Sequence, residues 1–167
     1  MDADLQHPPE KVPELLKSLR DDGNDFVIGT RYAKGCEIDK DWPLHRRIIS
    51  EGARLLARPL SPLSDPMSGF FGVKREVWEA HREKISAVGF KIALETFVKA
   101  GCQRYGEVAI NFGTRIHGES KLTGSVMLKY VQHLAQLYRF RFPFLLMFLV
   151  ILFCFMFFVL VRMLLLL

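Results

Sequence analysis

Apolar residues along this chain follow two spacings. Positions three or four residues apart predict helices over residues 12–19, 43–57, 76–85, 91–100 and 126–138. Short apolar runs beside turn residues predict strands over 25–29, 65–73 and 105–112, the second of them starting as a turn. Strands that alternate with helices are typical of an α/β sheet. Three or four strands are few for such a domain.

The C-terminal end follows neither pattern. The 20 residues from Phe142 to Val161 carry no charge. At about 1.5 Å per residue, a helix of this length matches the roughly 30 Å hydrocarbon core of a bilayer. We therefore expect residues 142–167 to form a transmembrane anchor, with Arg162 reaching the far interface. The alternative is a buried core helix, which a domain this small could not surround on all sides.

Residues 125–141 form an amphipathic segment before this apolar stretch. Basic side chains on the domain side, Lys129, Arg139 and Arg141, predict that the globular part is cytoplasmic. The apolar face of this segment has two possible partners: the membrane surface or the globular domain itself. The sequence leaves both open.

Net charge and cysteine content exclude several classes of protein. The chain has 23 basic and 18 acidic residues in 167, a net charge of +5. This mild excess suits anionic lipids or phosphates, and no arginine-rich run indicates nucleic acid. Cys36, Cys102 and Cys154 have neither disulfide nor zinc-site spacing, which indicates free thiols in a reducing compartment.

Two carboxylates stand at the start of the chain. In an extended segment, Asp2 and Asp4 point to the same side, and Gln6 follows with an amide oxygen. Oxygen ligands of this kind suit Mg²⁺ or Mn²⁺ bound together with substrate phosphates. The alternative is a pair of solvated carboxylates at a chain end.

A scattered basic set falls at expected strand ends, helix starts and polar loops, where functional groups are common. Arginine is suited to bidentate binding of phosphate. The alternative for each residue is ordinary surface charge. The set consists of Arg31, Arg46, Arg47, Arg115 and Lys121. No nucleophile elbow or phosphate-loop lysine motif is present, and the histidines lack metal-ligand spacing.

Six sequence strings, taken in order, resemble the family of dolichyl-phosphate mannosyltransferases. They are MDADLQHPPE, IGTRYAKG, WPLHRRIISEGARLLARPL, SDPMSGFFGVKREV, GFKIALE and FGTRIHGESKLTG. The resemblance implies a partial nucleotide-diphospho-sugar transferase domain, a Rossmann-like α/β/α sandwich, followed by one C-terminal transmembrane helix. In this interpretation residues 1–124 are the C-terminal portion of the catalytic domain, 125–141 a juxtamembrane helix and 142–167 the anchor. Family members carry a guanosine-binding segment before the Asp-Ala-Asp residues, so the resemblance implies an N-terminally truncated chain.

The resemblance also implies an activity, a place and a set of partners. The activity is inverting transfer of mannose from GDP-mannose to dolichyl phosphate, with Mg²⁺ or Mn²⁺ as cofactor, for glycosylation and GPI-anchor synthesis. The place is the endoplasmic reticulum membrane, with a single span, a cytoplasmic domain and membrane lipid as a further partner. Two alternatives stay open: an inactive membrane-anchored fragment of that enzyme, or a related polyprenyl-phosphate glucosyltransferase, although such relatives usually carry two spans.

Site residues follow from the same resemblance. Asp2, Asp4 and Gln6 match the metal-binding positions, and Asp4 and Arg115 the positions expected to act in catalysis. The expected substrate-binding residues are Asp2, Ala3, Arg31, Arg46, Ser50, Arg115 and Lys121. A phosphate monoester is mostly dianionic at pH 7 and needs no general base. We therefore expect Glu95 to be a structural residue on a helix face.

Overall fold

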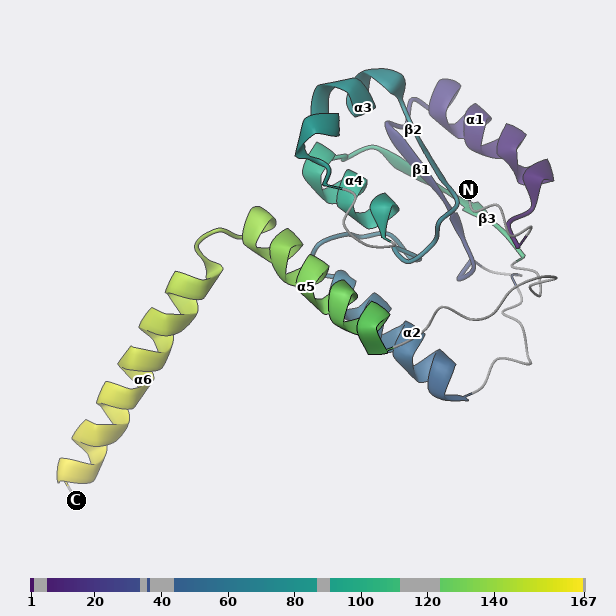
Figure 1. The fold of residues 1–167 in the computed structure, drawn as a ribbon. Coiled ribbons are helices and arrows are strands. Elements are labelled where there is room, and N and C mark those ends of the chain that lie inside the picture. Colours follow the sequence, from purple (N-terminus) through teal and green to yellow (C-terminus); the bar gives the residue numbers. More distant parts are fainter. Residues whose placement is uncertain (2–5, 34–35, 37–43, 87–90, 112–123, 167) are drawn as a thin grey trace.

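The described part of the chain folds around a small mixed sheet. The computed structural model describes residues 1, 6–33, 36, 44–86, 91–111 and 124–166. Within these residues the sheet has three strands in the order β2-β1-β3 (Figure 1). The central strand β1 (Phe26–Thr30) pairs antiparallel with β2 (Phe71–Val73) and parallel with β3 (Tyr105–Ala109). The three predicted strands are present; β1 is shifted by one residue, and β2 and β3 are shorter than predicted.

Helices cover both faces of β1. All five residues of the strand are buried, and successive side chains point to opposite faces. Val27 packs with Leu15 of helix α1 (Val12–Arg20), whereas Phe26 and Ile28 pack with residues of helix α4 (Ile92–Ala100). A strand buried on both faces explains the continuous apolar run Phe26–Ile28. Helix, sheet and helix form three layers, as the predicted α/β class requires.

A second apolar layer joins α4 to two longer helices, α2 (Leu44–Ala57) and α5 (Gly124–Arg141). The ribbon drawing shows these two helices next to each other below the sheet (Figure 1). Leu134 and Leu137 of α5 are buried against residues of α4. The hydroxyls of Tyr130 and Tyr138 each donate a 2.8 Å hydrogen bond to a backbone carbonyl of α2. An apolar face of α5 therefore packs on the domain, one of the two partners left open by the sequence.

The remaining elements connect these layers. Helix α3 (Arg75–His81) continues as a 3₁₀ turn, η2 (Arg82–Lys84), so the predicted helix over 76–85 ends early. A second 3₁₀ turn, η1 (Pro9–Lys11), precedes α1. Gly101 ends α4 in the left-handed region with φ of 63°, a conformation that glycine adopts without a steric penalty.

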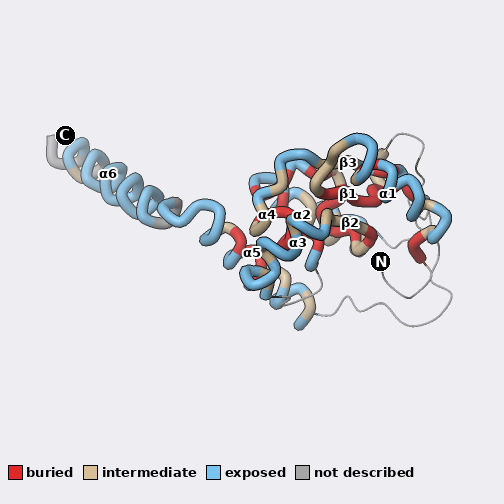
Figure 2. The backbone as a smooth tube through the Cα atoms, turned by 90° about the horizontal axis from the view of Figure 1, so that it is seen from above, coloured by how far each residue is buried: buried red, intermediate tan, exposed pale blue. Residues whose placement is uncertain are grey.

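The prediction of a C-terminal transmembrane helix is wrong for the described residues. Helix α5 ends at Arg141, and α6 (Leu145–Leu166) begins only after a break that contains Pro143. Residues 142–161 therefore do not form one helix. A span requires about 20 consecutive apolar residues in helical conformation, and no helix in the described part of the chain combines the length and apolarity needed to cross a bilayer. Figure 2 shows α6 extending away from the domain with mostly exposed residues.

A buried polar cluster lies where α4 meets α5. Glu95 is 0% exposed, and its Oε1 accepts hydrogen bonds from the backbone N and Oγ of Ser86 and from Lys99 Nζ. Oε2 lies 3.4 Å from Nε2 of His133, which is also buried. Burial opposes the charge of Glu95, but the contacts with Lys99 and Ser86 outweigh it and lower the pKa of this carboxyl. Glu95 thus forms a buried ion pair with Lys99 and links α4 to its neighbours in the core.

The same cluster makes stability depend on pH. Burial lowers the pKa of His133 below its ordinary value of 6.5, despite the opposing effect of Glu95. Below that value the unfolded chain binds more protons at this site than the folded chain, so this contribution to stability is complete above pH 6.5 and is lost as pH falls. We expect the melting temperature to fall as pH is lowered from 7 to 5, with part of the fall abolished in His133→Gln. His45→Gln, which changes an exposed histidine, is the control. Its melting temperature should fall with pH as much as that of the unsubstituted chain.

Candidate functional site

The candidate site lies at the carboxyl end of β1, where Arg31 follows the strand. Asp65, which is 0% exposed, accepts a bidentate pair from the Arg31 guanidinium: Oδ2 from Nε at 2.7 Å and Oδ1 from Nη2 at 2.9 Å. The backbone N of Arg31 also donates to Oδ2, at 3.3 Å. Burial disfavours the charge of Arg31, but the contacts with Asp65 outweigh it and raise the pKa of the guanidinium. Arg31 therefore stays charged and has one edge fixed.

The segment that carries Asp65 lies tightly against β1. The backbone N of Gly29 donates a 2.7 Å hydrogen bond to the carbonyl of Phe70. A Cβ at position 29 would come within 2.7 Å of the Phe70 side chain. A glycine in the middle of a strand is explained by this close approach. Gly29 thus allows the 64–70 segment to reach the end of the strand.

A chain of hydrogen bonds fixes the same segment to β3. Glu107 of β3 accepts from the backbone N of Ser64 at 2.6 Å and from its hydroxyl at 2.7 Å. The Ser64 hydroxyl also lies 2.6 Å from the hydroxyl of Thr30. The Thr30 hydroxyl accepts from the backbone N of Tyr32 at 3.1 Å. Two strands and the 64–70 segment are thereby tied together around Arg31.

Tyr32 connects this end of β1 to helix α2. The guanidinium of Arg54 stacks 4.5 Å from the centre of the Tyr32 ring, within the range of a cation–π contact. Ser50 and Glu51 of α2 lie close enough to influence the pKa of the Tyr32 hydroxyl. Burial raises the pKa of the Tyr32 hydroxyl, which stays protonated at neutral pH. The structure therefore brings Arg31 and Ser50, two of the expected substrate-binding residues, to either side of one tyrosine.

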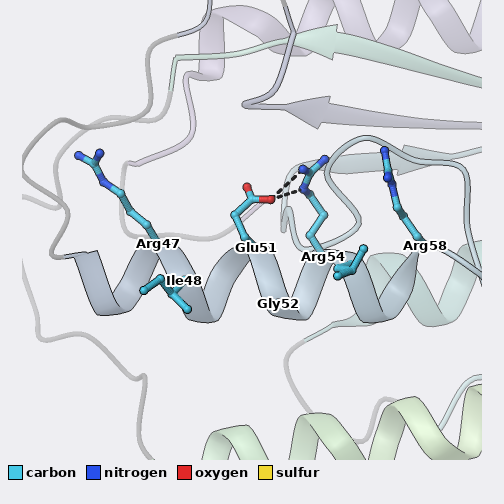
Figure 3. A pocket seen from close by; sticks show the side chains of 7 residues that line it. Arg47, Ile48, Glu51, Gly52, Arg54 and Arg58 are labelled. Carbon is cyan, nitrogen blue, oxygen red and sulfur yellow. Dashed lines mark hydrogen bonds and ion pairs between the residues drawn. The ribbon is translucent and has the colours of Figure 1, made fainter.

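A basic pocket of about 490 Å³ lies along the same helix. Figure 3 shows Arg47, Glu51, Arg54 and Arg58 projecting from α2 to the side on which the strands lie. Glu51 Oε2 accepts from Nε of Arg54 at 3.0 Å and from Nη2 at 2.7 Å. Ile48, Gly52 and Leu55 complete the lining. Three guanidinium groups against one carboxylate make this surface suitable for an anion.

The sequence-predicted site residues divide into two groups. Asp2, Ala3, Asp4, Arg115 and Lys121 lie outside the described residues. The others lie within them: Gln6, Arg31, Arg46 and Ser50. Arg46 and Ser50 are both partly buried on α2 and share a helix face, since they are four residues apart.

Gln6 is the one expected metal ligand within the described residues. It is 5% exposed, and the ring of the next residue, His7, stacks 5.4 Å from that of Phe70. The start of the chain therefore lies against the same 64–70 segment that holds Arg31. Within the described residues no group of three or more His, Cys, Asp or Glu side chains could hold a metal ion. The donor set Asp2, Asp4 and Gln6 has the hard oxygen chemistry that Mg²⁺ and Mn²⁺ prefer.

Three residues of the site were not predicted from the sequence: Asp65, Tyr32 and Arg54. The sequence signal was that all three lie in strings shared with the family: IGTRYAKG, WPLHRRIISEGARLLARPL and SDPMSGFFGVKREV. Asp65 was assigned to a turn because it precedes Pro66. Its partner Arg31 lies 34 positions away, so no local pattern links the two.

Comparison with known proteins finds similarity to glycosyltransferases. Residues 1–82 match the sequence profile of Glycosyl transferase family 2. The dolichol-phosphate mannosyltransferase of Mycosarcoma maydis is 59% identical over 144 residues, which are 85% of this chain and 49% of that protein. The Saccharomyces cerevisiae enzyme of the same name is 53% identical over 148 residues, 85% of this chain and 55% of its own.

A more distant relative extends the comparison. The dolichol-phosphate mannosyltransferase of Pyrococcus furiosus is 41% identical over 143 residues, 83% of this chain and 40% of that protein. The chain thus spans about half the length of the curated relatives it matches. These matches confirm the resemblance inferred from the motifs: the chain is similar to dolichol-phosphate mannosyltransferases and matches the Glycosyl transferase family 2 profile over residues 1–82.

Proposed function

We propose that this protein transfers a mannosyl group from GDP-mannose to dolichyl phosphate, with inversion at the anomeric carbon. The observation that supports this most is the 59% identity, over 144 residues, to a protein named for that reaction. The charged Arg31 at the end of the central strand is compatible with it, because both substrates carry phosphate. We further propose that the reaction takes place at the endoplasmic reticulum.

The proposed reaction needs little acid–base catalysis by the protein. The acceptor phosphate is mostly dianionic at pH 7 and can attack without a general base. The work left to the protein is to orient the attacking phosphate and to stabilise charge as it develops on the leaving nucleotide. Arg31, together with the α2 residues Arg46 and Ser50, is proposed to hold the acceptor phosphate.

A divalent cation completes the proposed site. Asp2, Asp4 and Gln6 would hold Mg²⁺ or Mn²⁺, and Asp4, with Arg115, would act in catalysis. When bound, the ion would supply positive charge against the diphosphate of the leaving GDP. Ala3 and Lys121, from the same family strings, are proposed to contact substrate.

The direct test is a transfer assay with the 167-residue chain. GDP-mannose labelled in the sugar is incubated with dolichyl phosphate and Mg²⁺ or Mn²⁺, and label is measured in the lipid fraction. We expect labelled dolichyl phosphate mannose from the unsubstituted chain, none from Arg31→Ala, and normal yield from Arg104→Ala, which alters an exposed arginine before β3. Transfer from UDP-glucose instead would indicate the related glucosyltransferase. No transfer of either sugar by a folded chain would identify an inactive fragment.

A further inference from the structure

The ring of Tyr32 lies close to two arginine–carboxylate pairs. The guanidinium of Arg54 is 4.5 Å from the ring centre, and that of Arg31 is 6.0 Å from it. Each guanidinium has its own carboxylate partner, Glu51 for Arg54 and Asp65 for Arg31. Two like charges can therefore lie near one ring, because each is balanced by a carboxylate. The attraction between a cation and the face of a tyrosine favours both contacts.

Helix α2 is fixed to the domain from more than one side. All its residues from Leu44 to Ala57 are described, and among them only Ala57 is buried. The tyrosine hydroxyls of α5 bind the carbonyls of Ala53 and Leu56, near the same end of the helix. These contacts come from α5. The contact between Arg54 and Tyr32 comes from the end of β1, so it adds a second element that limits rotation of α2 about its axis.

The arginine that contacts Tyr32 shares a helix face with two expected phosphate ligands. Arg46, Ser50 and Arg54 follow one another at four-residue spacing, which places them on one side of a helix. All three are partly buried, whereas Arg47 is exposed. Ser50 also lies close enough to Tyr32 to influence the pKa of its hydroxyl. The side of α2 that is turned to the end of β1 is therefore the side with Arg46 and Ser50.

We propose that Tyr32 is a positioning residue for phosphate binding. By holding Arg54 against the end of β1, its ring turns one face of α2 toward Arg31. That face carries Arg46 and Ser50. The ligand class is a phosphate monoester on an isoprenyl chain. This inference rests on the proposed function for the ligand, since that proposal assigns the acceptor phosphate to Arg31 and the two α2 residues.

Orientation is the physical gain. Side chains that already stand in a binding geometry lose less conformational entropy when a ligand arrives than side chains that must first be ordered. Tyr32 adds no charge at neutral pH, because burial raises the pKa of its hydroxyl. A role through the ring face predicts that phenylalanine can replace this tyrosine. A role through direct hydrogen bonding of the hydroxyl to the ligand predicts that it cannot.

The test is a calorimetric titration of the 167-residue chain with a short-chain, soluble isoprenyl phosphate and, separately, with inorganic phosphate. We expect Tyr32→Leu to weaken binding of the isoprenyl phosphate by about 3- to 30-fold, which corresponds to the loss of one cation–π contact. Tyr32→Phe should bind within about twofold of the unsubstituted chain. Melting curves establish that each variant is folded. Stronger binding of the isoprenyl phosphate than of inorganic phosphate identifies the lipid acceptor as the source.

Arg54→Gln tests the other side of the same contact. It should weaken binding about as much as Tyr32→Leu does. The double variant should lose little more than either single variant, because both changes break one contact. Arg75→Gln, which removes an exposed positive charge from α3, is the matched control and should bind normally. If Tyr32→Leu does not fold, Arg54→Gln decides, compared with this control.

Three results would overturn the proposal. They are an unchanged affinity in Tyr32→Leu, an affinity of Tyr32→Phe as low as that of Tyr32→Leu, and additive losses in the double variant with Arg54→Gln. Absence of binding by the folded, unsubstituted chain would refute this inference and the proposed function together. Binding that depends on Tyr32 as described, but without sugar transfer, would refute only the proposed function.

Discussion

Replacing Asp4 with alanine is expected to abolish mannosyl transfer, with a loss of about a thousandfold or more. The family resemblance assigns Asp4 to the metal site. A divalent cation there would neutralise the charge that develops on the leaving GDP, and no other expected ligand could take the place of Asp4. The measurement is the rate of lipid labelling from GDP-mannose at saturating Mg²⁺. Thermal melting of the same variant should match that of the unsubstituted chain, because the loss concerns chemistry and not the fold.

The control for Asp4 is Asp22→Ala, an exposed aspartate in the turn after α1. It removes the same kind of side chain and changes the net charge by the same amount, and it should leave the rate unchanged. A rate for Asp4→Ala within a few-fold of the unsubstituted rate would remove Asp4 from the metal site. An equal loss in both variants would attribute the effect to net charge instead.

Replacing Glu95 with alanine is expected to cost about 3–5 kcal/mol of folding free energy. The change leaves the ammonium of Lys99 and the donors of Ser86 without the carboxylate oxygen that they share at 2.6–2.9 Å. It also removes the partner of His133, through which α4 contacts α5. A buried charge without its partner destabilises the fold by more than the intact pair stabilises it. Denaturant unfolding followed by circular dichroism gives the number.

Glu79→Ala is the matched control for Glu95. Glu79 is also a helical glutamate in a pair with a basic residue four positions away, Arg75, at 3.7 Å. Both of those side chains are exposed, by 61% and 86%, so the pair is screened by water. We expect a change below about 0.5 kcal/mol. Similar losses of unfolding free energy in the two variants would mean that burial does not strengthen the interactions of Glu95.

Local sequence pattern predicted most of the secondary structure. The apolar run Phe26–Ile28 is explained by burial of β1 on both faces, and the 3.6-residue period of α1 and α5 by packing of one helix face. The prediction of a transmembrane helix near the C-terminal end was wrong: no helix of the described residues is long and apolar enough to cross a membrane. Hydropathy also did not reveal that the helix α6 begins only after Pro143.

The candidate site was predicted unevenly. Arg31 was chosen because it follows a strand, and the structure gives it a buried, oriented position there. Asp65 was missed because an aspartate before a proline fits a turn equally well. Glu95 was predicted to be structural, but its position as a buried link between α4 and α5 could not be inferred from its neighbours in sequence.

By itself the sequence determined the α/β character, the family relationship and the residue types suited to phosphate, because periodicity and motif order are local properties of a chain. Only the tertiary structure decided which charges meet. Arg31 and Asp65 lie 34 positions apart, Ser64 and Glu107 43. Ion pairs and hydrogen bonds act over about 3 Å in space, so their partners are set by how strands and helices pack and not by distance along the chain.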